Sequence, residues 1–303
     1  MKQSVLFFQR ISLLLSALLL LAGCSSSDSE EQEKGGDSQP EIRFNADVWQ
    51  VMERTRATTF DNDAALKSEG FKCFAYTAET TTPYINGVTV NWVDDTEWRF
   101  SDGKHYWPSS SSLDFFAYLP VEKPSYMSEP SYSYSSGQKL SFTCTMPITS
   151  ATQGSGVKEF VYAFAANQSK STNGGSVNLT FHHPFARIIL AEGTIDGEVT
   201  VTGITLNSIK YNETFSSGNS PQWTSAGSTD NFTTSGFGGP FLVIPQSWPG
   251  SIDVNITRSG TPDVLSTTVA TEWEAGYSYT YTISVSGGGL IINVGTDKYA
   301  EQW

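Results

Sequence analysis

Three pairs of residues in this chain have types that could support chemistry at a protein site. His182 and His183 could bind a metal, but neighbouring residues of a strand point to opposite faces, so they cannot converge on one ion. The run from Asp61 to Asp63 begins like a calcium loop yet lacks the third acid and the glycine. Asp94 and Asp95 suit a hairpin tip better than an acid–base pair. Because no serine-hydrolase, zinc or phosphate-loop motif is present either, we expect no enzyme activity, no metal and no cofactor.

Cys24 is the residue whose neighbours best define its chemistry. Lys2 and Arg10 give a positively charged start, and an apolar run over 11–21 follows that is too short to span a bilayer. The run ends in the string LAGC at Cys24, which resembles the lipobox of bacterial lipoproteins. That resemblance implies a signal peptide over residues 1–23 and a diacylated Cys24 as the new amino terminus. The alternative is an ordinary secretory signal with a chance cysteine.

The segment 24–40 is a flexible acidic tether by composition. It has no periodic apolar residues and is rich in Ser and acidic residues. The formal charge is −13, and removal of Lys2 and Arg10 with the signal peptide gives −13 − 2 = −15. A body this acidic excludes nucleic acid as a partner and leaves membrane attachment to the lipid. The acids directly after Cys24 resemble a surface-export signal of some Gram-negative lipoproteins, which implies a surface-exposed place on the outer membrane; a plain acidic linker is the alternative.

The rest of the chain predicts an all-β protein. Of its 303 residues only 16% are charged, whereas aromatic residues make up 13% and suit half-buried strands. Alternation of apolar and polar residues marks about seven strands in the second half, the density of a β-sandwich. At about 100–200 residues per domain, we expect two tandem sandwiches, an N-terminal domain over 41–172 and a C-terminal domain over 173–285. The polar stretch 167–175 is the expected linker.

Two segments at the ends of this body are strand-like. Residues 41–48 alternate cleanly, and the side chains expected on one face are Ile42, Phe44, Ala46 and Val48. Residues 286–303 form a tail that begins with three glycines at 287–289. In this tail the side chains that share a face are Leu290, Ile292 and Val294. The tail either lies outside both sandwiches as a donor strand or packs on its own domain.

Two further cysteines remain for the folded body. Cys73 shares a strand face with Phe71, and Cys144 shares one with Phe142, so both suit a small apolar core position. Because an exported chain can form disulfides, the sequence leaves a bridge between Cys73 and Cys144 open.

Five short motifs, in order along the chain, resemble fimbrillin-family lipoproteins. The elements are TRA near Arg54, YWP at 106–108 followed by LDFFAYLP at 113–120, FHHPFAR at 181–187, the Pro-Gln step at 245–246 and WEAGYSY at 273–279. They cover about residues 41–285 and stand behind the lipobox-like string. Each is weak alone, but together they are specific.

The resemblance implies a subunit of type V pili, the adhesive fimbriae of Gram-negative anaerobes. Members of the family have two transthyretin-like sandwiches and cross the outer membrane as lipoproteins. In polymerising members a protease cuts after an arginine behind the first strand, which implies processing at Arg54 or Arg56. Removal of strand 41–48 would open a groove that a strand from another subunit fills, such as the tail of residues 290–294. A stalk, tip or anchor role stays open, as do homo- and hetero-polymers and a host or bacterial receptor.

A second class of function stays open as well. A surface lipoprotein that binds glycans would use exposed tryptophans as stacking platforms, and the candidates for this role are Trp49, Trp223 and Trp248.

Overall fold

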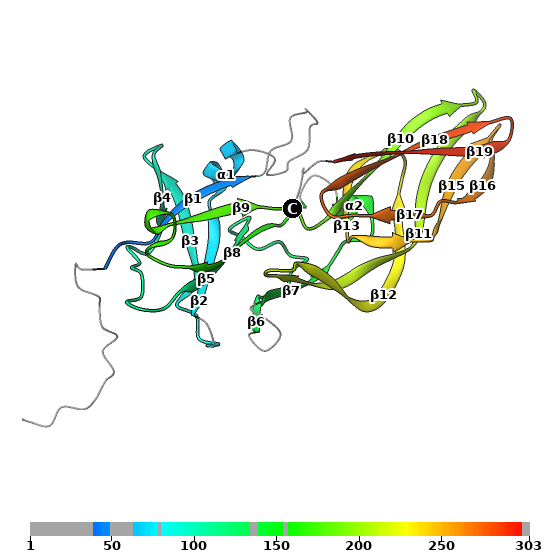
Figure 1. The fold of residues 1–303 in the computed structure, drawn as a ribbon. Coiled ribbons are helices and arrows are strands. Elements are labelled where there is room, and N and C mark those ends of the chain that lie inside the picture. Colours follow the sequence, from blue (N-terminus) through cyan, green and yellow to red (C-terminus); the bar gives the residue numbers. More distant parts are fainter. Residues whose placement is uncertain (1–38, 49–62, 78–79, 134–138, 154–156, 299–303) are drawn as a thin grey trace, which may run out of the picture. The chain divides into compact units, whose positions relative to one another are not determined.

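The structure is a computed structural model that describes residues 39–48, 63–77, 80–133, 139–153 and 157–298 (Figure 1). Strands dominate these ranges, which confirms the all-β prediction. The first half contains β1 (Arg43–Val48), α1 (Asp63–Glu69), β2 (Phe71–Thr77), β3 (Ile85–Val93), β4 (Glu97–Phe100), β5 (Leu113–Leu119), β6 (Ser131–Ser133), β7 (Lys139–Thr145), α2 (Ser150–Gln153), β8 (Val161–Gln168), η1 (Thr172–Gly175) and β9 (Ser176–Phe181). The second half contains β10 (Ala186–Ile195), β11 (Val199–Ser217), β12 (Gln222–Thr234), β13 (Gly238–Val243), β14 (Gln246–Trp248), β15 (Ser251–Arg258), β16 (Thr261–Thr268), β17 (Thr271–Trp273), β18 (Tyr277–Ser286) and β19 (Gly289–Lys298).

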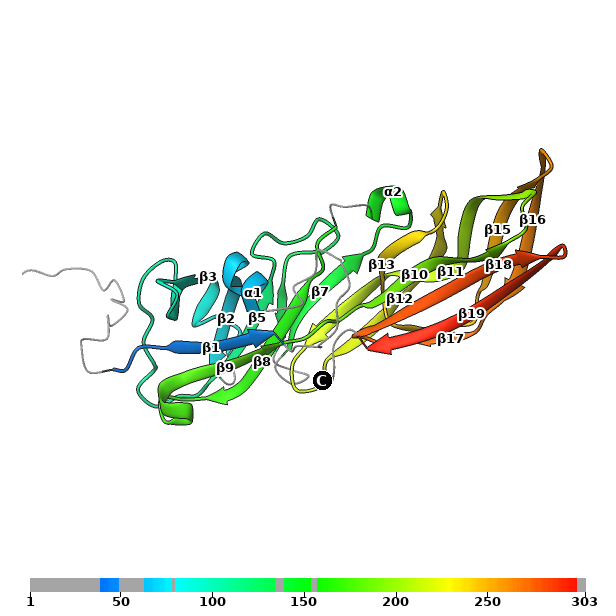
Figure 2. The same cartoon turned by 90° about the horizontal axis from the view of Figure 1, so that it is seen from above.

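The first sandwich consists of a five-stranded sheet and a two-stranded sheet. The larger sheet is antiparallel, in the order β4-β3-β2-β5-β8. The smaller one pairs β1 with β9 in parallel, and the two strands run side by side in both views (Figures 1 and 2). Alternate side chains of β1 and β9 enter one apolar core together with residues of β2 and β5. Both strands therefore need the alternation that the sequence carries.

The second sandwich encloses a separate core. One of its sheets has the order β13-β10-β18-β19, and the other has the order β16-β15-β11-β7-β6, with β12 also paired to β11. Residues such as Ile188 and Ile283 from the four-stranded sheet meet Leu206 and Val254 from the other sheet. A short pair, β14 with β17, brings Trp248 and Trp273 into the same core.

Strands on both sides of the expected domain boundary, between residues 172 and 173, pack in the other sandwich. β9 was expected to open the C-terminal domain, yet Val177, Leu179 and Phe181 belong to the core of the first sandwich. Conversely β7, from the first half of the chain, pairs with β11 from Asn212↔Thr145 to Ser217↔Leu140. A third apolar cluster joins Phe74 and Phe116 on the outer face of the five-stranded sheet to residues of β7, β11 and β13. The stretch 167–175 thus connects β8 to β9 within the first sandwich.

The C-terminal segment forms a hairpin with the strand before it. β19 pairs antiparallel with β18 along ten positions, from Ser286↔Gly289 to Tyr277↔Lys298. Gly287 and Gly288 have φ of 57° and 80°, the left-handed values that a two-residue hairpin turn requires. The described part of the tail, up to Lys298, therefore packs on its own domain, which is one of the two alternatives that the sequence left open.

Candidate functional site

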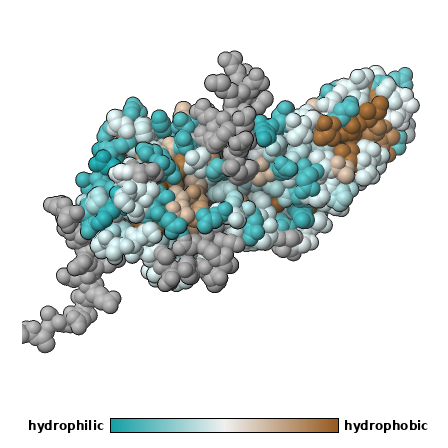
Figure 3. Space-filling model, in the orientation of Figure 1, coloured by the Kyte–Doolittle hydropathy of each residue, from teal (hydrophilic) through white to brown (hydrophobic). Residues whose placement is uncertain are grey.

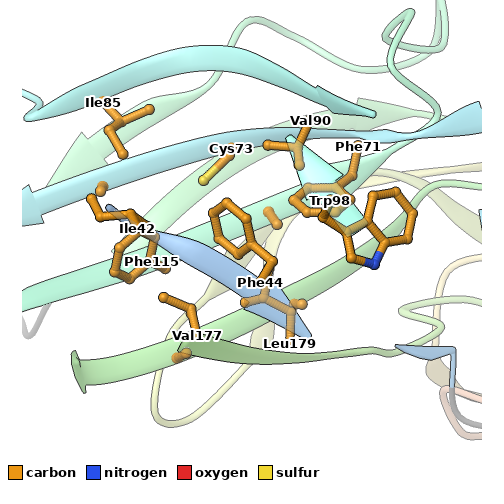
Figure 4. Close-up of a cluster of buried hydrophobic side chains, with 14 of the residues drawn as sticks. Ile42, Phe44, Phe71, Cys73, Ile85, Val90, Trp98, Phe115, Val177 and Leu179 are labelled. Carbon is orange, nitrogen blue, oxygen red and sulfur yellow. The ribbon is translucent and has the colours of Figure 1, made fainter. Parts of the chain in front are cut away.

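The inward-facing side chains of β1 fill the centre of the first core. Ile42 and Phe44 are 3% and 6% exposed, and Ala46 packs against the same core while partly buried. Figure 4 shows Ile42 and Phe44 between the five-stranded sheet and β9, with Phe115, Val177 and Leu179 around them. Val48 pairs with Phe181 through its backbone, and its side chain lies outside the described residues. We call the residues that contact Ile42, Phe44 and Ala46 the β1 groove.

Main-chain hydrogen bonds hold β1 on both edges. Along one edge the pairing with β9 runs from Arg43↔Ser176 to Val48↔Phe181. On the other edge the Ile42 amide donates to the His105 carbonyl at 2.8 Å, and the Trp107 amide donates to the Pro40 carbonyl at 3.0 Å. The segment is thus held by non-local pairs, as an added strand would be.

Polar contacts fix the outward face of β1. The Asn45 amide nitrogen donates to Asn178 Oδ1 at 2.9 Å, and the Thr180 hydroxyl donates to Asp47 Oδ1 at 3.2 Å. A cleft of about 380 Å³ borders the same strand, and its lining includes Asn45, Lys67 of α1 and Trp92 of β3. Part of β1 therefore lies against solvent rather than against protein.

β19 is the edge strand of its sheet and is weakly covered. Leu290 and Ile292 pack partly buried against the second core, whereas Val294 is 39% exposed. Ile291, on the opposite face, is 55% exposed, and Val264 of β16 is 54% exposed. Figure 3 shows a hydrophobic patch at the end of the second sandwich, where β16 and β19 lie in Figure 1. Among the described strands, removal of β19 would break only the main-chain pairing with β18.

A buried ionic cluster lies where the two sandwiches meet. Glu159, just before β8, places Oε1 3.0 Å from Nδ1 of His183 and Oε2 3.0 Å from Nη2 of Arg187. All three side chains are at most 4% exposed. His183 lies between β9 and β10, and Arg187 lies on β10, so one carboxylate ties the first sandwich to the start of the second. Sequence reasoning missed Glu159, because a single acid before a strand carries no periodic signal.

The ionisation of Glu159 depends on its two partners. Burial alone would raise its pKa, but the nearby His183 and Arg187, through charge and hydrogen bonds, more than offset this and lower the pKa to about 2. The carboxylate is therefore charged at neutral pH, and the cluster supports structure.

Residues of three other motifs, YWP, the Pro-Gln step and WEAGYSY, also make buried contacts. Gln246 accepts from the Lys210 amide at 2.8 Å and donates to the Ile244 carbonyl at 2.9 Å. The Trp273 indole donates to the Tyr281 hydroxyl at 2.9 Å, and the Trp107 indole donates to the Gly175 carbonyl at 3.0 Å. These motifs thus act in packing.

The other chemical candidates take structural positions. Asp63 begins α1, and Asp94 and Asp95 occupy the β3–β4 turn with φ near +53° and +54°. Within the described ranges no cluster of His, Cys, Asp and Glu is arranged to hold a metal ion. Those ranges also contain no helix with the length and apolar character needed to cross a membrane.

Cys73 and Cys144 are both free and buried. They lie in different apolar clusters, Cys73 in the first core and Cys144 in the cluster that joins the sandwiches. Burial raises the pKa of both thiols, that of Cys144 to about 12, so neither is a ready nucleophile. The structure contains no bridge between them.

The tryptophans considered for glycan stacking are not exposed where they are described. Trp248 is 1% exposed and stacks on Trp273 at 4.8 Å. The Trp223 indole donates to the Pro184 carbonyl at 2.9 Å, and its ring packs beside Phe185. A stacking platform at Trp248 is therefore wrong, because protein atoms cover this ring, whereas Trp223 is partly buried. Trp49 lies outside the described residues, as do Cys24, Arg54 and Arg56.

Comparisons with known proteins address the fold and the family. A family model described as fimbrillin-like matches residues 55–298. A search of curated proteins found no match. Among solved structures, a fimbrial protein from Bacteroides vulgatus is similar with a TM-score of 0.55 and 15% identity, covering 86% of this chain and 100% of that one.

Two further solved structures have a similar fold. A candidate cell adhesion protein from Bacteroides uniformis has a TM-score of 0.56 and 15% identity, covering 86% of this chain and 99% of that one. Another from Bacteroides ovatus has a TM-score of 0.54 and 16% identity, covering 88% of this chain and 99% of that one. At these identities the likeness shows the fold alone.

Proposed function

This chain belongs to the fimbrillin-like family, and from that membership we propose that it is a structural or accessory subunit of cell-surface adhesive fimbriae. In this proposal the chain is exported as a surface lipoprotein of the outer membrane. A protease then removes β1, and subunits assemble when a strand of one fills the β1 groove of the next. The partners are other fimbrial subunits.

The observation that carries the proposal is the position of β1 in the first core. Its side chains supply the centre of an apolar core, yet the strand is the first of the described strands and its contacts with that core are non-covalent. Loss of β1 would expose the β9 edge together with an apolar strip, which is a template for another strand. Arg54 and Arg56 lie six and eight residues after the end of β1, so a cut there separates β1 from everything after it.

β19 supports the other half of the proposal. As an edge strand with half-buried side chains, it loses one ladder when it leaves β18. Its inward residues Leu290, Ile292 and Val294 repeat with the period of two that the groove of another subunit needs.

We expect processing after Arg56 or Arg54 to control entry into fibres. Protein in sheared fibres should begin at Ala57 or Thr55, as read by N-terminal sequencing. The double variant Arg54→Ala, Arg56→Ala should stay with the cells and be lost from the fibres. Wild-type amounts of the double variant in fibres would refute processing at these arginines, and fibre protein that begins at Cys24 would point to an anchor.

The same fibre preparation tests β19 as a donor to the groove of a different fimbrial subunit. Ile292→Asp places a charge on the inward face, where it would enter an apolar groove without a partner, whereas Ile291→Asp places it on the outward face. We expect fibre yield to fall for Ile292→Asp and to persist for Ile291→Asp. Equal yields would exclude β19 as the donor. Melting of the purified monomers checks that both variants fold.

Lipid attachment at Cys24 is a separate expectation. Cys24→Ser should leave unprocessed precursor and abolish incorporation of labelled palmitate, because the acylated sulfur is gone. Cys144→Ser serves as the control, since this buried thiol lies in the folded body. Palmitate uptake by Cys24→Ser would contradict the lipoprotein assignment.

A further inference from the structure

We propose that the β1 groove is shaped for an aromatic side chain at its centre, and that the strand which fills it comes from a different subunit, not from β19 of a second copy. The inference rests on the proposed strand exchange and specifies the partner. It follows from the aromatic lining of the pocket that Phe44 occupies.

The central pocket is built from aromatic rings. The Phe44 ring lies 5.5 Å from Phe71, 5.2 Å from Phe100 and 5.9 Å from Phe115, measured between ring centroids. The interplanar angles are 89°, 68° and 87°, so each neighbour meets Phe44 edge to face. Edge-to-face contacts stabilise an aromatic side chain in this pocket by more than its buried area alone would. Three rings from three different strands thus select the side chain at this position.

The flanking positions differ in how enclosed they are. Ile42 is buried at 3% exposure, whereas Ala46 is partly buried and borders the cleft of about 380 Å³. Phe44 is the middle of these three positions. A strand inserted in either direction therefore places its own middle residue in the aromatic pocket.

β19 does not match these pockets. Its inward triplet is Leu290, Ile292 and Val294, so Ile292 would leave space among the rings in either direction of insertion. No residue of β19 is aromatic.

The residues after β19 do not supply a better match. Tyr299 is an aromatic candidate by sequence, but Asp297 and Glu301 stand two residues away on either side. In register with Tyr299 at the centre, two carboxylates would enter the apolar flanking pockets without partners. Trp303 is likewise preceded by Glu301 at that spacing. The occupant expected is therefore a segment of a different subunit that has an aromatic residue between two apolar residues at every second position.

Competition between peptides on the full chain, cut in the 49–62 connector, tests this fit. A fluorescent peptide of residues 40–48 is exchanged into the cut protein, and its displacement is followed by anisotropy. The competitors are the peptide 289–303, a matched variant of it with Ile292→Phe, and a control with Asn293→Phe, which puts the ring on the outward face. We expect the matched variant to compete at concentrations at least tenfold lower than the native 289–303 peptide, and the control to gain nothing.

The outcomes distinguish aromatic selection in the β1 groove from the strand exchange on which it rests. If native 289–303 competes as well as the matched variant, the aromatic selection is wrong while strand exchange stands. The same holds if Asn293→Phe gains as much as Ile292→Phe, because the effect would then be general hydrophobicity. If even the 40–48 peptide fails to exchange into the cut protein, strand exchange at this groove is wrong and the partner inference falls with it.

Discussion

Glu159→Gln should lower the free energy of unfolding by about 3–5 kcal/mol at neutral pH. The substitution removes the charge that holds both His183 and Arg187, and a buried ion left without its partner costs about this much. Urea denaturation, read at matched m-values, measures the loss. Glu97→Gln is the matched control, because Glu97 pairs with Arg99 at the surface, where such pairs contribute about 0–1 kcal/mol.

The pH dependence of stability gives a second signature of this cluster. The pKa of Glu159 is about 2 in the folded protein, below the reference value of 4.5 for an unfolded chain. Because the folded pKa is the lower one, its stabilisation is complete above about pH 4.5 and is lost as pH falls toward 2. The gap between wild type and Glu159→Gln should therefore close in that window. A gap below about 1 kcal/mol at pH 7, with parallel acid curves, would show that the cluster does not hold the junction.

Phe44→Ala should lower the free energy of unfolding by about 3–5 kcal/mol, the usual range for a buried phenylalanine. The Phe71, Phe100 and Phe115 rings lie on three strands of one sheet, so they cannot collapse fully into the space. Asn45→Ala is the control on the same strand. It removes one exposed hydrogen bond to Asn178 and should cost about 1 kcal/mol.

Thermal and urea unfolding of the two β1 variants measures this difference. If Phe44→Ala costs no more than Asn45→Ala, then Phe44 is not central to the first core. The aromatic pocket inferred above would then lack its energetic basis.

Local patterns in the sequence were sufficient to predict the strands but not their partners. Residues 41–48 were predictable as a half-buried strand, because alternation of Ile42, Phe44 and Ala46 is visible within one short window. That β9 is the partner of β1 could not be predicted, since the pairing joins segments more than a hundred residues apart and leaves no local trace. The same holds for β7, whose alternation fits either sandwich equally well.

The β18–β19 hairpin does have a signal in the sequence. The glycines at 287–289 suit a free tail, but two glycines between alternating runs are also the mark of a tight hairpin turn. Polar partners inside the fold are harder to foresee. Glu159 precedes a strand in an unremarkable context, and only the three-dimensional path brings it to His183 and Arg187.

The path of β7 and β9 has a consequence for the order in which an exported chain can fold. The first sandwich cannot close its core until residue 181 has emerged, because β9 is the only partner of β1 among the described strands. β7 must in turn wait for β11, whose pairing segment ends at Ser217. These distant contacts make folding slow to nucleate, since long loops must close before they gain any contact energy. In the proposed export, a chain delivered from its N-terminus therefore stays unfolded until the residues up to Ser217, more than two thirds of the sequence, have been delivered.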